Sequence, residues 1–364
     1  MKAAVMFAVG APLEIVDIEL DDPQSHEVVV KVKASGLCHS DLHTMKTDFG
    51  WPVPLVLGHE VSGVVESIGS GVTAVAVGDH VVANLISSCG ACRRCRSGVP
   101  TECTNPGAIR RGPDESARYT LDGAPVTQIG DIGGFAEKIL VHERNLVTID
   151  KTIPFDRAAL LGCGVITGIG AVKNAARVAF GDDVAVIGCG GVGLNVVQGA
   201  AISGARHVIA IDLQPSKLEL AKKFGATVTI NPAETDDIVA RIREIVGKDG
   251  VDYAFEVIGL PQTAQQAVEI TGQGGTAFIL GKMKPGTGVT LPAADLLKPH
   301  KSLRGLYMGL TVADVDIPLY ADLYQQGRLN LDDLISETIS LDEINEGYEK
   351  LEKGATARSV LVFD

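Results

Sequence analysis

Short alternating segments dominate the chain up to about residue 153. Residues 28–33 (VVVKVK) alternate between apolar and polar side chains, which predicts a strand, and residues 61–68 and 79–84 show a similar pattern. Glycines such as Gly36, Gly69 and Gly78 separate these segments. The polar, glycine-rich stretch 104–134 predicts a long surface excursion. This part of the chain therefore predicts a mostly β domain.

From about Asp156 the pattern changes to strands that alternate with helices. We expect strands at 183–187, 207–211, 227–230, 251–257 and 276–280, and helices at 192–203, 216–224, 235–246 and 262–270. This alternation predicts an α/β domain with a doubly wound parallel sheet. We expect the last strand, 359–363, to return to the first domain. The parallel-sheet domain, 165–307, is then an insertion in a domain made of 1–164 and 308–364.

Composition is consistent with two packed domains. The 364 residues are 46% hydrophobic but only 4% aromatic, and the mean hydropathy is +0.21. A net charge of −13 argues against nucleic acid or an anionic membrane as a partner. We expect no apolar stretch of membrane-spanning length, and the acidic residues soon after the N-terminal apolar run argue against a secretory signal. An odd number of cysteines, clustered at metal-binding spacing, favours a reducing compartment, and we expect a cytoplasmic protein.

A glycine-rich turn lies where a dinucleotide would bind. Residues 188–193 (GCGGVG) carry the pattern G-x-G-x-x-G after a predicted strand and before a predicted helix. Asp212 ends the next predicted strand and can accept hydrogen bonds from both ribose hydroxyls, which favours NAD over NADP. We expect Lys217 near the ribose and Cys189 to be a packing residue. The predicted cofactor-binding residues of this turn are Gly188, Gly190, Gly191, Val192 and Gly193.

Four of the seven cysteines form a compact thiol set. Cys89, Cys92, Cys95 and Cys103 follow the spacing C-x2-C-x2-C-x7-C, which suits a closed tetrahedral zinc site. Such a site has no free position for a substrate, so we expect it to be structural.

A second set of candidate ligands is Cys38, His59 and Cys163. Two thiolates and a neutral imidazole leave a zinc ion with no net charge and a free fourth position. A zinc ion there would lower the pKa of a bound alcohol, so that an alkoxide could give a hydride to a nicotinamide. Metal and dinucleotide together therefore indicate interconversion of alcohols and carbonyls.

Residues beside these ligands could assist. Ser40 could pass on the alcohol proton, and His43 could receive it through the cofactor ribose. Asp41 could orient His59, and Glu60 could modulate the field at the metal.

These motifs resemble the zinc-dependent medium-chain alcohol dehydrogenases nearly end to end. The stretch 58–63 (GHEVSG), followed by Gly69 and Val72, matches the family's zinc signature, and the thiol set matches its structural zinc lobe. The resemblance implies a GroES-like catalytic domain with an inserted Rossmann domain, NAD, and two zinc ions per subunit. It also implies that His39 and Arg358 contact the cofactor pyrophosphate.

The segment after Cys103 is similar to the dimeric, liver-like branch, which includes class III-like thiol-adduct formaldehyde dehydrogenases. The surroundings of Cys163 and of the glycine-rich turn resemble bacterial members of that branch. The resemblance implies a homodimer, with a tetramer as the alternative. Trp51, Leu85 and Phe135 are the expected walls of an apolar pocket, which favours aliphatic or aromatic primary alcohols and their aldehydes.

Three other functions are alternatives. The first is a formaldehyde dehydrogenase acting on a glutathione or mycothiol adduct, although no anionic thiol-binding set is evident in the sequence. The second is a non-catalytic, zinc-stabilised NAD-binding protein, against which the intact ligand and relay residues argue. The third is a zinc-free reductase of the same superfamily, which would need neither ligand set.

Overall fold

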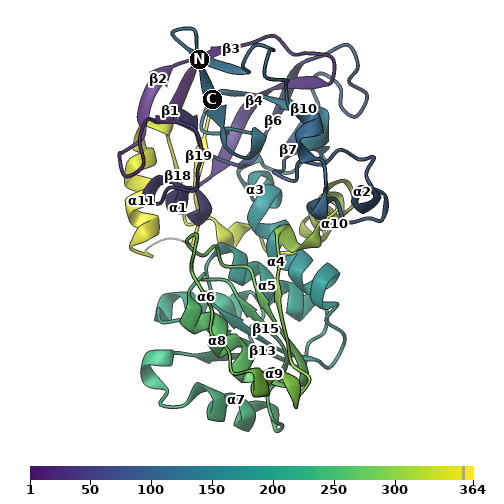
Figure 1. The fold of residues 1–364 in the computed structure, drawn as a ribbon, viewed down its shortest axis with the longest axis vertical. Coiled ribbons are helices and arrows are strands. Elements are labelled where there is room, and N and C mark those ends of the chain that lie inside the picture. Colours follow the sequence, from purple (N-terminus) through teal and green to yellow (C-terminus); the bar gives the residue numbers. More distant parts are fainter. Residues whose placement is uncertain (355–356) are drawn as a thin grey trace. The chain divides into compact units, whose positions relative to one another are not determined.

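The computed structural model describes residues 1–354 and 357–364 and shows two compact units (Figure 1). One unit combines Met1–Gly164 with Thr311–Asp364, and the other is the continuous stretch Val165–Leu310. The sequence predicts that the chain re-enters the first unit at residue 308. In the structure it re-enters that unit at Thr311. Residues 308–310 stay with the second unit because Gly309, at φ +60°, packs so closely on the helix backbone at Ile166 and Thr167 that a side chain would not fit.

The first unit contains, within its described residues, two mixed sheets. Their strand orders are β2-β1-β5-β9-β8-β3 and β11-β7-β6-β4-β19-β18, and β10 also pairs with β4. Most neighbours are antiparallel, whereas β5–β9 and β18–β19 are parallel. The strands are β1 (Lys2–Met6), β2 (Glu14–Asp17), β3 (Glu19–Leu20), β4 (Glu27–Gly36), β5 (Leu55–Val56), β6 (Glu60–Ile68), β7 (His80–Ala83), β8 (Tyr119–Leu121), β9 (Ala124–Gln128), β10 (Lys138–His142), β11 (Leu146–Thr148), β18 (Glu337–Ile339) and β19 (Ser359–Val362).

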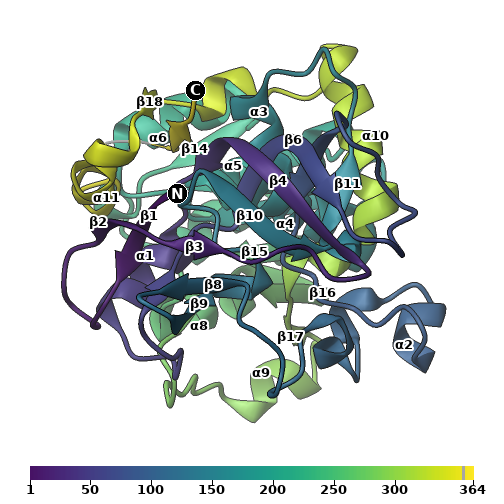
Figure 2. The same ribbon diagram turned by 90° about the horizontal axis from the view of Figure 1, so that it is seen from above.

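Strand β4 is the centre of the second sheet. It pairs with β6 along one edge from Val28 to Gly36, and β4, β6 and β10 are labelled in Figure 2. Strands β10 and β19 share the other edge of β4. Val28, Val30 and Val32 alternate along β4 and are buried in one apolar cluster. The alternation in the sequence therefore marks the face of β4 that packs in the core.

The stretch 104–134 is more than a surface excursion. It contains the β8–β9 hairpin, whose turn places Asp122 and Gly123 at positive φ. Tyr119 on β8 is fully buried, and its hydroxyl donates to the Lys138 carbonyl at 3.0 Å. The high polar and glycine content of this stretch does not predict a hairpin. The hairpin is held to the core by one buried aromatic side chain, Tyr119.

Helices connect and cover these sheets. In the described residues of the first unit they are α1 (His39–Lys46), α2 (Arg93–Arg96), α3 (Phe155–Leu160), α10 (Ala313–Gln325) and α11 (Ile344–Glu352). In the second unit they are α4 (Ile166–Gly170), α5 (Gly191–Ile202), α6 (Pro215–Lys223), α7 (Ile238–Val246), α8 (Pro261–Ile270) and α9 (Ala293–Leu297). Helix α7 begins three residues later than expected because the Asp237 side chain caps it by accepting from the Ala240 amide at 2.9 Å.

The second unit confirms the predicted doubly wound sheet. All its strand pairs are parallel, in the order β14-β13-β12-β15-β16-β17, which is the Rossmann order. The strands are β12 (Asp183–Ile187), β13 (His207–Ile211), β14 (Val228–Ile230), β15 (Val251–Glu256), β16 (Thr271–Ile279) and β17 (Ser302–Gly305). Because the sheet is covered on both faces, β12 is buried along its whole length.

One apolar helical run reaches membrane-spanning length, contrary to the prediction from the sequence. Phe155–Ala176 spans 22 residues with a mean hydropathy of 1.4, enough by length and composition to cross a membrane. However, 83% of its most apolar window is buried inside the protein, as in the core helix of a globular protein. The run also carries the chain from the first unit into the second.

Asp183, at the start of β12, is a buried carboxylate held by cations. Arg206 donates to both of its oxygens at 2.6 and 2.9 Å, and His207 and Lys248 lie 2.9 and 3.0 Å away. Burial alone would raise the pKa of Asp183, but these partners outweigh it and lower the pKa to about 2.

We expect Asp183→Asn to lower the free energy of unfolding at pH 7 by about 1–2 kcal/mol, after discounting for the solvent exposure of the cations. Because the pKa of Asp183 is depressed on folding, this stabilisation is present above the unfolded value and is lost as the pH falls toward about 2. Urea denaturation at several pH values measures it. The control is Glu219→Gln, which removes an exposed ion pair with Lys222. An equal loss of unfolding free energy in both variants would contradict the prediction.

Candidate metal and dinucleotide sites

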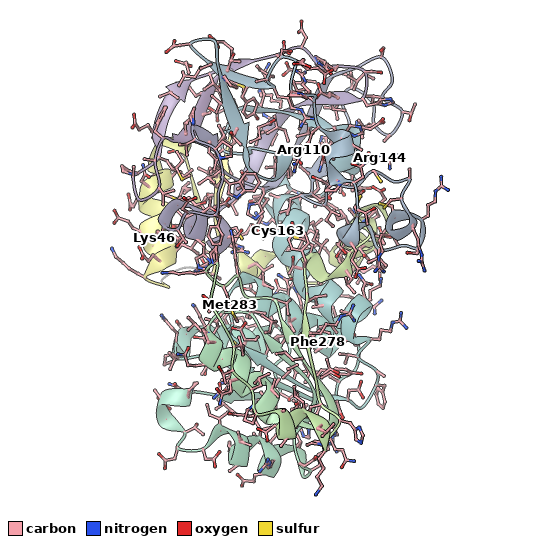
Figure 3. All side chains as sticks on the ribbon, in the orientation of Figure 1. Lys46, Arg110, Arg144, Cys163, Phe278 and Met283 are labelled. Carbon is pink, nitrogen blue, oxygen red and sulfur yellow. The ribbon has the colours of Figure 1, made fainter. Side chains whose placement is uncertain are left out.

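Three distant segments bring Cys38, His59 and Cys163 together in the first unit. Their ligand atoms all lie within 4.8 Å of one another, and their exposed fractions are 6%, 4% and 7%. Cys38 is the N-cap of α1, and His59 directly precedes β6. Cys163, labelled in Figure 3, lies in a π-helical turn, Leu161–Val165. Such turns widen a helix and are frequent at functional sites.

The surroundings of His59 determine which of its nitrogens can bind a metal. Asp41 Oδ1 lies 3.1 Å from His59 Nδ1 and also accepts from the Gly58 amide at 3.3 Å. This contact leaves Nε2 directed to the cluster, where Ser40 Oγ lies 3.1 Å away. Ser40 Oγ is also 3.2 Å from Cys38 Sγ. The structure thus places the predicted orienting carboxylate on one nitrogen and the predicted relay hydroxyl beside two ligand atoms.

The three side chains of the cluster shift one another's pKa values. A hydrogen bond from Cys163, assisted by the nearby Arg358, lowers the pKa of Cys38 well below its usual value, while the same bond and burial raise the pKa of Cys163. Burial opposes protonation of His59, but Asp41 and Cys38 outweigh it and raise the pKa of His59. Two thiols and one imidazole converging in a buried site fit the donor set of a zinc ion with a free position.

Glu60 lies next to this cluster and is fully buried. One of its oxygens accepts from Arg358 at 3.0 Å. Gly36 and Gly164 line the pair, since a Cβ at Gly36 would overlap the Glu60 carboxylate and one at Gly164 would stand 3.0 Å from the Arg358 guanidinium. Burial, which outweighs the attraction to Arg358, raises the pKa of Glu60 to about 7.

Arg358 has a position that the sequence did not reveal. The sequence assigns it to the cofactor pyrophosphate, whereas its side chain is 3% exposed, paired with Glu60 and 3.9 Å from Cys38 Sγ. The pairing of Val360 with Gly36 in the β19–β4 ladder brings it there. Its contact with a pyrophosphate stays a prediction, and its observed contacts are with the metal-ligand cluster.

The other predicted residues of the first unit differ in burial. His39 and His43 lie one turn apart on α1 and are half-buried, so their predicted roles stay predictions. Trp51 and Leu85 are half-buried beside apolar clusters. Phe135 is fully buried against Gly58 and Tyr348, and its place in the wall of a substrate pocket stays a prediction.

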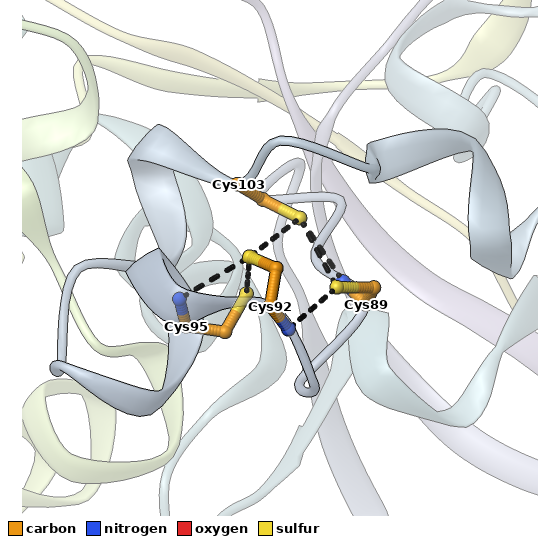
Figure 4. Close-up of side chains that lie close together, drawn as sticks. All are labelled: Cys89, Cys92, Cys95 and Cys103. Atoms are coloured by element: carbon orange, nitrogen blue, oxygen red, sulfur yellow. Dashed lines mark hydrogen bonds between the residues drawn. The ribbon is translucent and has the colours of Figure 1, made fainter.

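The four remaining metal-spaced cysteines converge separately (Figure 4). The sulfur atoms of Cys89, Cys92, Cys95 and Cys103 all lie within 4.8 Å of one another. Backbone amides of Cys89, Cys92 and Cys95 donate to neighbouring sulfurs at 3.3–3.5 Å. The Cys95 amide, followed by that of Thr104, lowers the pKa of Cys92 to about 5, whereas burial and the neighbouring thiols raise the pKa of Cys95 to about 12. The arrangement fits a closed four-thiolate zinc site.

In the second unit the glycine-rich turn has the shape that a dinucleotide requires. Gly188 has φ +102°, and a Cβ at Gly193 would overlap the Gly188 carbonyl oxygen. Around Gly190, by contrast, a Cβ would meet nothing within 4 Å. Gly190 precedes α5, whose first residues are Gly191 and Val192 and whose backbone amides lack a side-chain cap. This open helix start fits a pyrophosphate.

Asp212 is tied to the same turn. One of its oxygens accepts from the Cys189 amide at 2.8 Å and the other from the Gln214 amide at 2.9 Å. Cys189 is fully buried, and burial followed by the charge of Asp212 raises its pKa to about 12, against the opposing charge of Lys217. Asp212 and Lys217 therefore lie within electrostatic reach of the turn, as a ribose-binding pair should.

Comparisons with known proteins agree with this arrangement. Residues 24–151 match the sequence model of one protein family, the alcohol dehydrogenase GroES-like domain. Residues 191–324 match the sequence model of a second family, the zinc-binding dehydrogenase domain. The chain is 38% identical to the NDMA-dependent alcohol dehydrogenase of Amycolatopsis methanolica, over 99% of this chain and 98% of that protein. It is also 38% identical to S-(hydroxymethyl)glutathione dehydrogenase of Escherichia coli, over 100% and 99%.

Solved structures show the same similarity. Benzyl alcohol dehydrogenase of Acinetobacter calcoaceticus is 36% identical with a TM-score of 0.92, covering 100% of this chain and 99% of that one. Two more distant structures, from Sinorhizobium meliloti and Geotrichum candidum, are 28% and 29% identical and contain NADP and NAD. Fold and sites thus define a zinc-dependent oxidoreductase that uses a nicotinamide cofactor. The chain belongs to the zinc-dependent medium-chain alcohol dehydrogenase family.

The glycine-rich turn offers a matched pair of variants. Gly193→Ala should lower the melting temperature by several degrees, because its Cβ has to displace the Gly188 backbone. Gly190→Ala should keep the melting temperature but weaken NAD binding by about tenfold or more, because the open space is where the pyrophosphate approaches. Calorimetric melting and NAD titration measure both effects, and the reverse pattern would contradict the assignment.

Proposed function

We propose that the protein is an NAD-dependent zinc alcohol dehydrogenase that interconverts primary alcohols and aldehydes. The observation that carries the proposal is the convergence of Cys38, His59 and Cys163 with the Ser40 hydroxyl beside their ligand atoms. We further propose two zinc ions per chain, because the four-thiol cluster forms a separate site. A cytoplasmic homodimer is part of the proposal through the family resemblance.

The reaction removes a proton from the hydroxyl and a hydride from the carbon of the alcohol. Zinc in this donor set supplies a Lewis acid that acidifies the hydroxyl, and NAD supplies the hydride acceptor. Ser40, 3.1 Å from His59 Nε2, is placed to accept the hydroxyl proton, and His43 one turn later on α1 can pass it onward. Asp41 keeps the His59 ring in the orientation that directs Nε2 to the cluster.

The choice of NAD rests on Asp212. Its two oxygens already accept one backbone amide each, and each keeps a lone pair for a ribose hydroxyl. A 2′-phosphate would bring a dianion to the same carboxylate, which disfavours NADP. Lys217 lies close enough to moderate this repulsion.

For the substrate, half-buried Trp51 and Leu85 supply apolar side chains, which supports aliphatic and aromatic primary alcohols. The similarity to benzyl alcohol dehydrogenase supports the same class. The similarity to S-(hydroxymethyl)glutathione dehydrogenase supports a second candidate, oxidation of a thiol adduct of formaldehyde. A panel of alcohols with NAD, and of formaldehyde with and without glutathione or mycothiol, distinguishes them: NADH formation only in the thiol arms would overturn the first candidate.

Removing one ligand tests the metal centre. Wild-type protein should contain two zinc ions per chain, and Cys163→Ala should contain one and lose at least about 1,000-fold in kcat for alcohol oxidation. The matched variant Cys189→Ala removes a buried thiol outside both clusters and should keep both metal ions. Elemental analysis and NADH absorbance provide the two readouts. Alcohol oxidation that survives in Cys163→Ala would refute the mechanism.

Neutralising Asp212 tests the cofactor assignment. Asp212→Asn should reduce the preference for NAD over NADP, as the ratio of kcat/KM values, by about tenfold or more because the repelling charge is gone. Asp236→Asn, an exposed acidic residue of the same unit, is the charge-matched control and should leave the ratio unchanged. An unchanged ratio in Asp212→Asn would show that Asp212 does not contact the ribose.

A further inference from the structure

Near the metal-ligand cluster, the buried side-chain oxygens without a hydrogen bond among the described residues include Asp41 Oδ2, Glu60 Oε2 and the Tyr348 hydroxyl. The Asp41 carboxylate is 1% exposed; its Oδ1 contacts His59 and Gly58, but its Oδ2 has no hydrogen bond among the described residues. The hydroxyl of Tyr348 on α11 also has no hydrogen bond among the described residues, and Tyr348 is 2% exposed. Buried polar groups are almost always satisfied, by protein or by water, so this pair requires an explanation.

The two groups are close neighbours in the first unit. Helix α11 packs against α1, which carries Asp41, and Leu37 lies in contact distance of Gly347. The Tyr348 ring meets Phe135 edge-on at 6.1 Å, and Phe135 packs on Gly58, whose amide donates to Asp41. Tyr348 and Asp41 therefore contact the same short stretch of structure, Tyr348 through the Phe135 ring and Asp41 through the Gly58 amide.

Electrostatics determine which way a hydrogen bond between them would run. Burial, and then the charge of Asp41, raises the pKa of Tyr348 well above its usual value. The phenol is thus a permanent donor near neutral pH, and an ionised carboxylate is only an acceptor. The two atoms form no direct hydrogen bond, and a polar contact at longer range is commonly bridged by one water molecule.

We propose that Tyr348 is a positioning residue for the metal centre: its hydroxyl donates through a bridging buried water to Asp41 Oδ2 and so fixes the carboxylate that orients His59. The inference rests on the proposed zinc site. Without the hydroxyl, Asp41 would rotate more freely, the imidazole would be less well aligned, and the metal would dissociate faster.

The chain contains a matched control in Tyr320. This residue of α10 is also fully buried, its hydroxyl also lacks a partner among the described residues, and burial also raises its pKa. The charge that acts on it is that of Asp316 rather than of a residue beside the ligands. Tyr320→Phe and Tyr348→Phe thus remove the same atom from two buried sites, and only the second variant touches the proposed network.

The test follows zinc release from the full-length, metal-loaded protein to an excess of a chromogenic chelator. Zinc should leave the two sites in two kinetic phases. The phase that is absent in the Cys163→Ser variant is assigned to the site of Cys38, His59 and Cys163. Tyr348→Phe should accelerate that phase about threefold and leave the other phase unchanged, as expected for the loss of one neutral hydrogen bond. Tyr320→Phe should change neither phase, and both variants should have similar melting temperatures.

A double-mutant cycle separates positioning from general loosening. If Tyr348 acts through Asp41, Tyr348→Phe should have no further effect in an Asp41→Asn background. Equal release rates in Tyr348→Phe and Tyr320→Phe, or an unchanged effect of Tyr348→Phe in Asp41→Asn, would overturn the inference. If wild-type protein shows no phase that Cys163→Ser removes, the proposed metal site itself is wrong, which is a different result.

Discussion

The pairing of Gly36 with Glu60 at the end of the β4–β6 ladder determines where the metal ligands lie. It places Cys38 just beyond the end of β4 and His59 just before the start of β6. Their side chains therefore meet where these two neighbouring strands end. On its other edge Gly36 pairs with Val360, and this contact brings Arg358 to the same place. A Cβ at Gly36 would overlap a Glu60 carboxylate oxygen, so a side chain there would force Glu60 to move. A side chain there would disturb a strand end, a ligand pair and a buried ion pair together.

The buried charges around this point compensate one another. Cys38, whose thiol has a lowered pKa, and Glu60 are both buried, and the guanidinium of Arg358 lies 3.9 Å from the Cys38 sulfur and 3.0 Å from a Glu60 oxygen. Taking such groups out of water is costly unless each has a partner, so the C-terminal segment is part of the electrostatic balance of the metal site. This explains why a chain whose ligands all lie before residue 164 needs its last strand for a complete site.

Sequence patterns revealed much of this arrangement because some constraints are local. The bounds of β12 and β13, the glycine-rich turn and both cysteine sets follow from periodicity, backbone freedom and ligand spacing. The β8–β9 hairpin and the place of Arg358 did not follow, because each depends on a partner distant in the sequence, Lys138 for Tyr119 and Glu60 for Arg358. Tyr348 lies on the apolar face of an ordinary amphipathic helix, so nothing in its neighbourhood distinguishes it from a core residue.

The two thiol clusters show how burial decides ligand choice. Four thiolates around one zinc ion carry a net charge of −2, which is tolerable only near solvent or cations. The cluster of Cys89, Cys92, Cys95 and Cys103 is half-exposed, its sulfurs accept backbone amides, and the basic helix α2 runs through it. The buried cluster of Cys38, His59 and Cys163 could not hold that charge without a large desolvation cost. With a neutral imidazole in place of a third thiolate, a zinc complex at this site would be uncharged, and its free position could receive an oxygen whose proton is to be removed.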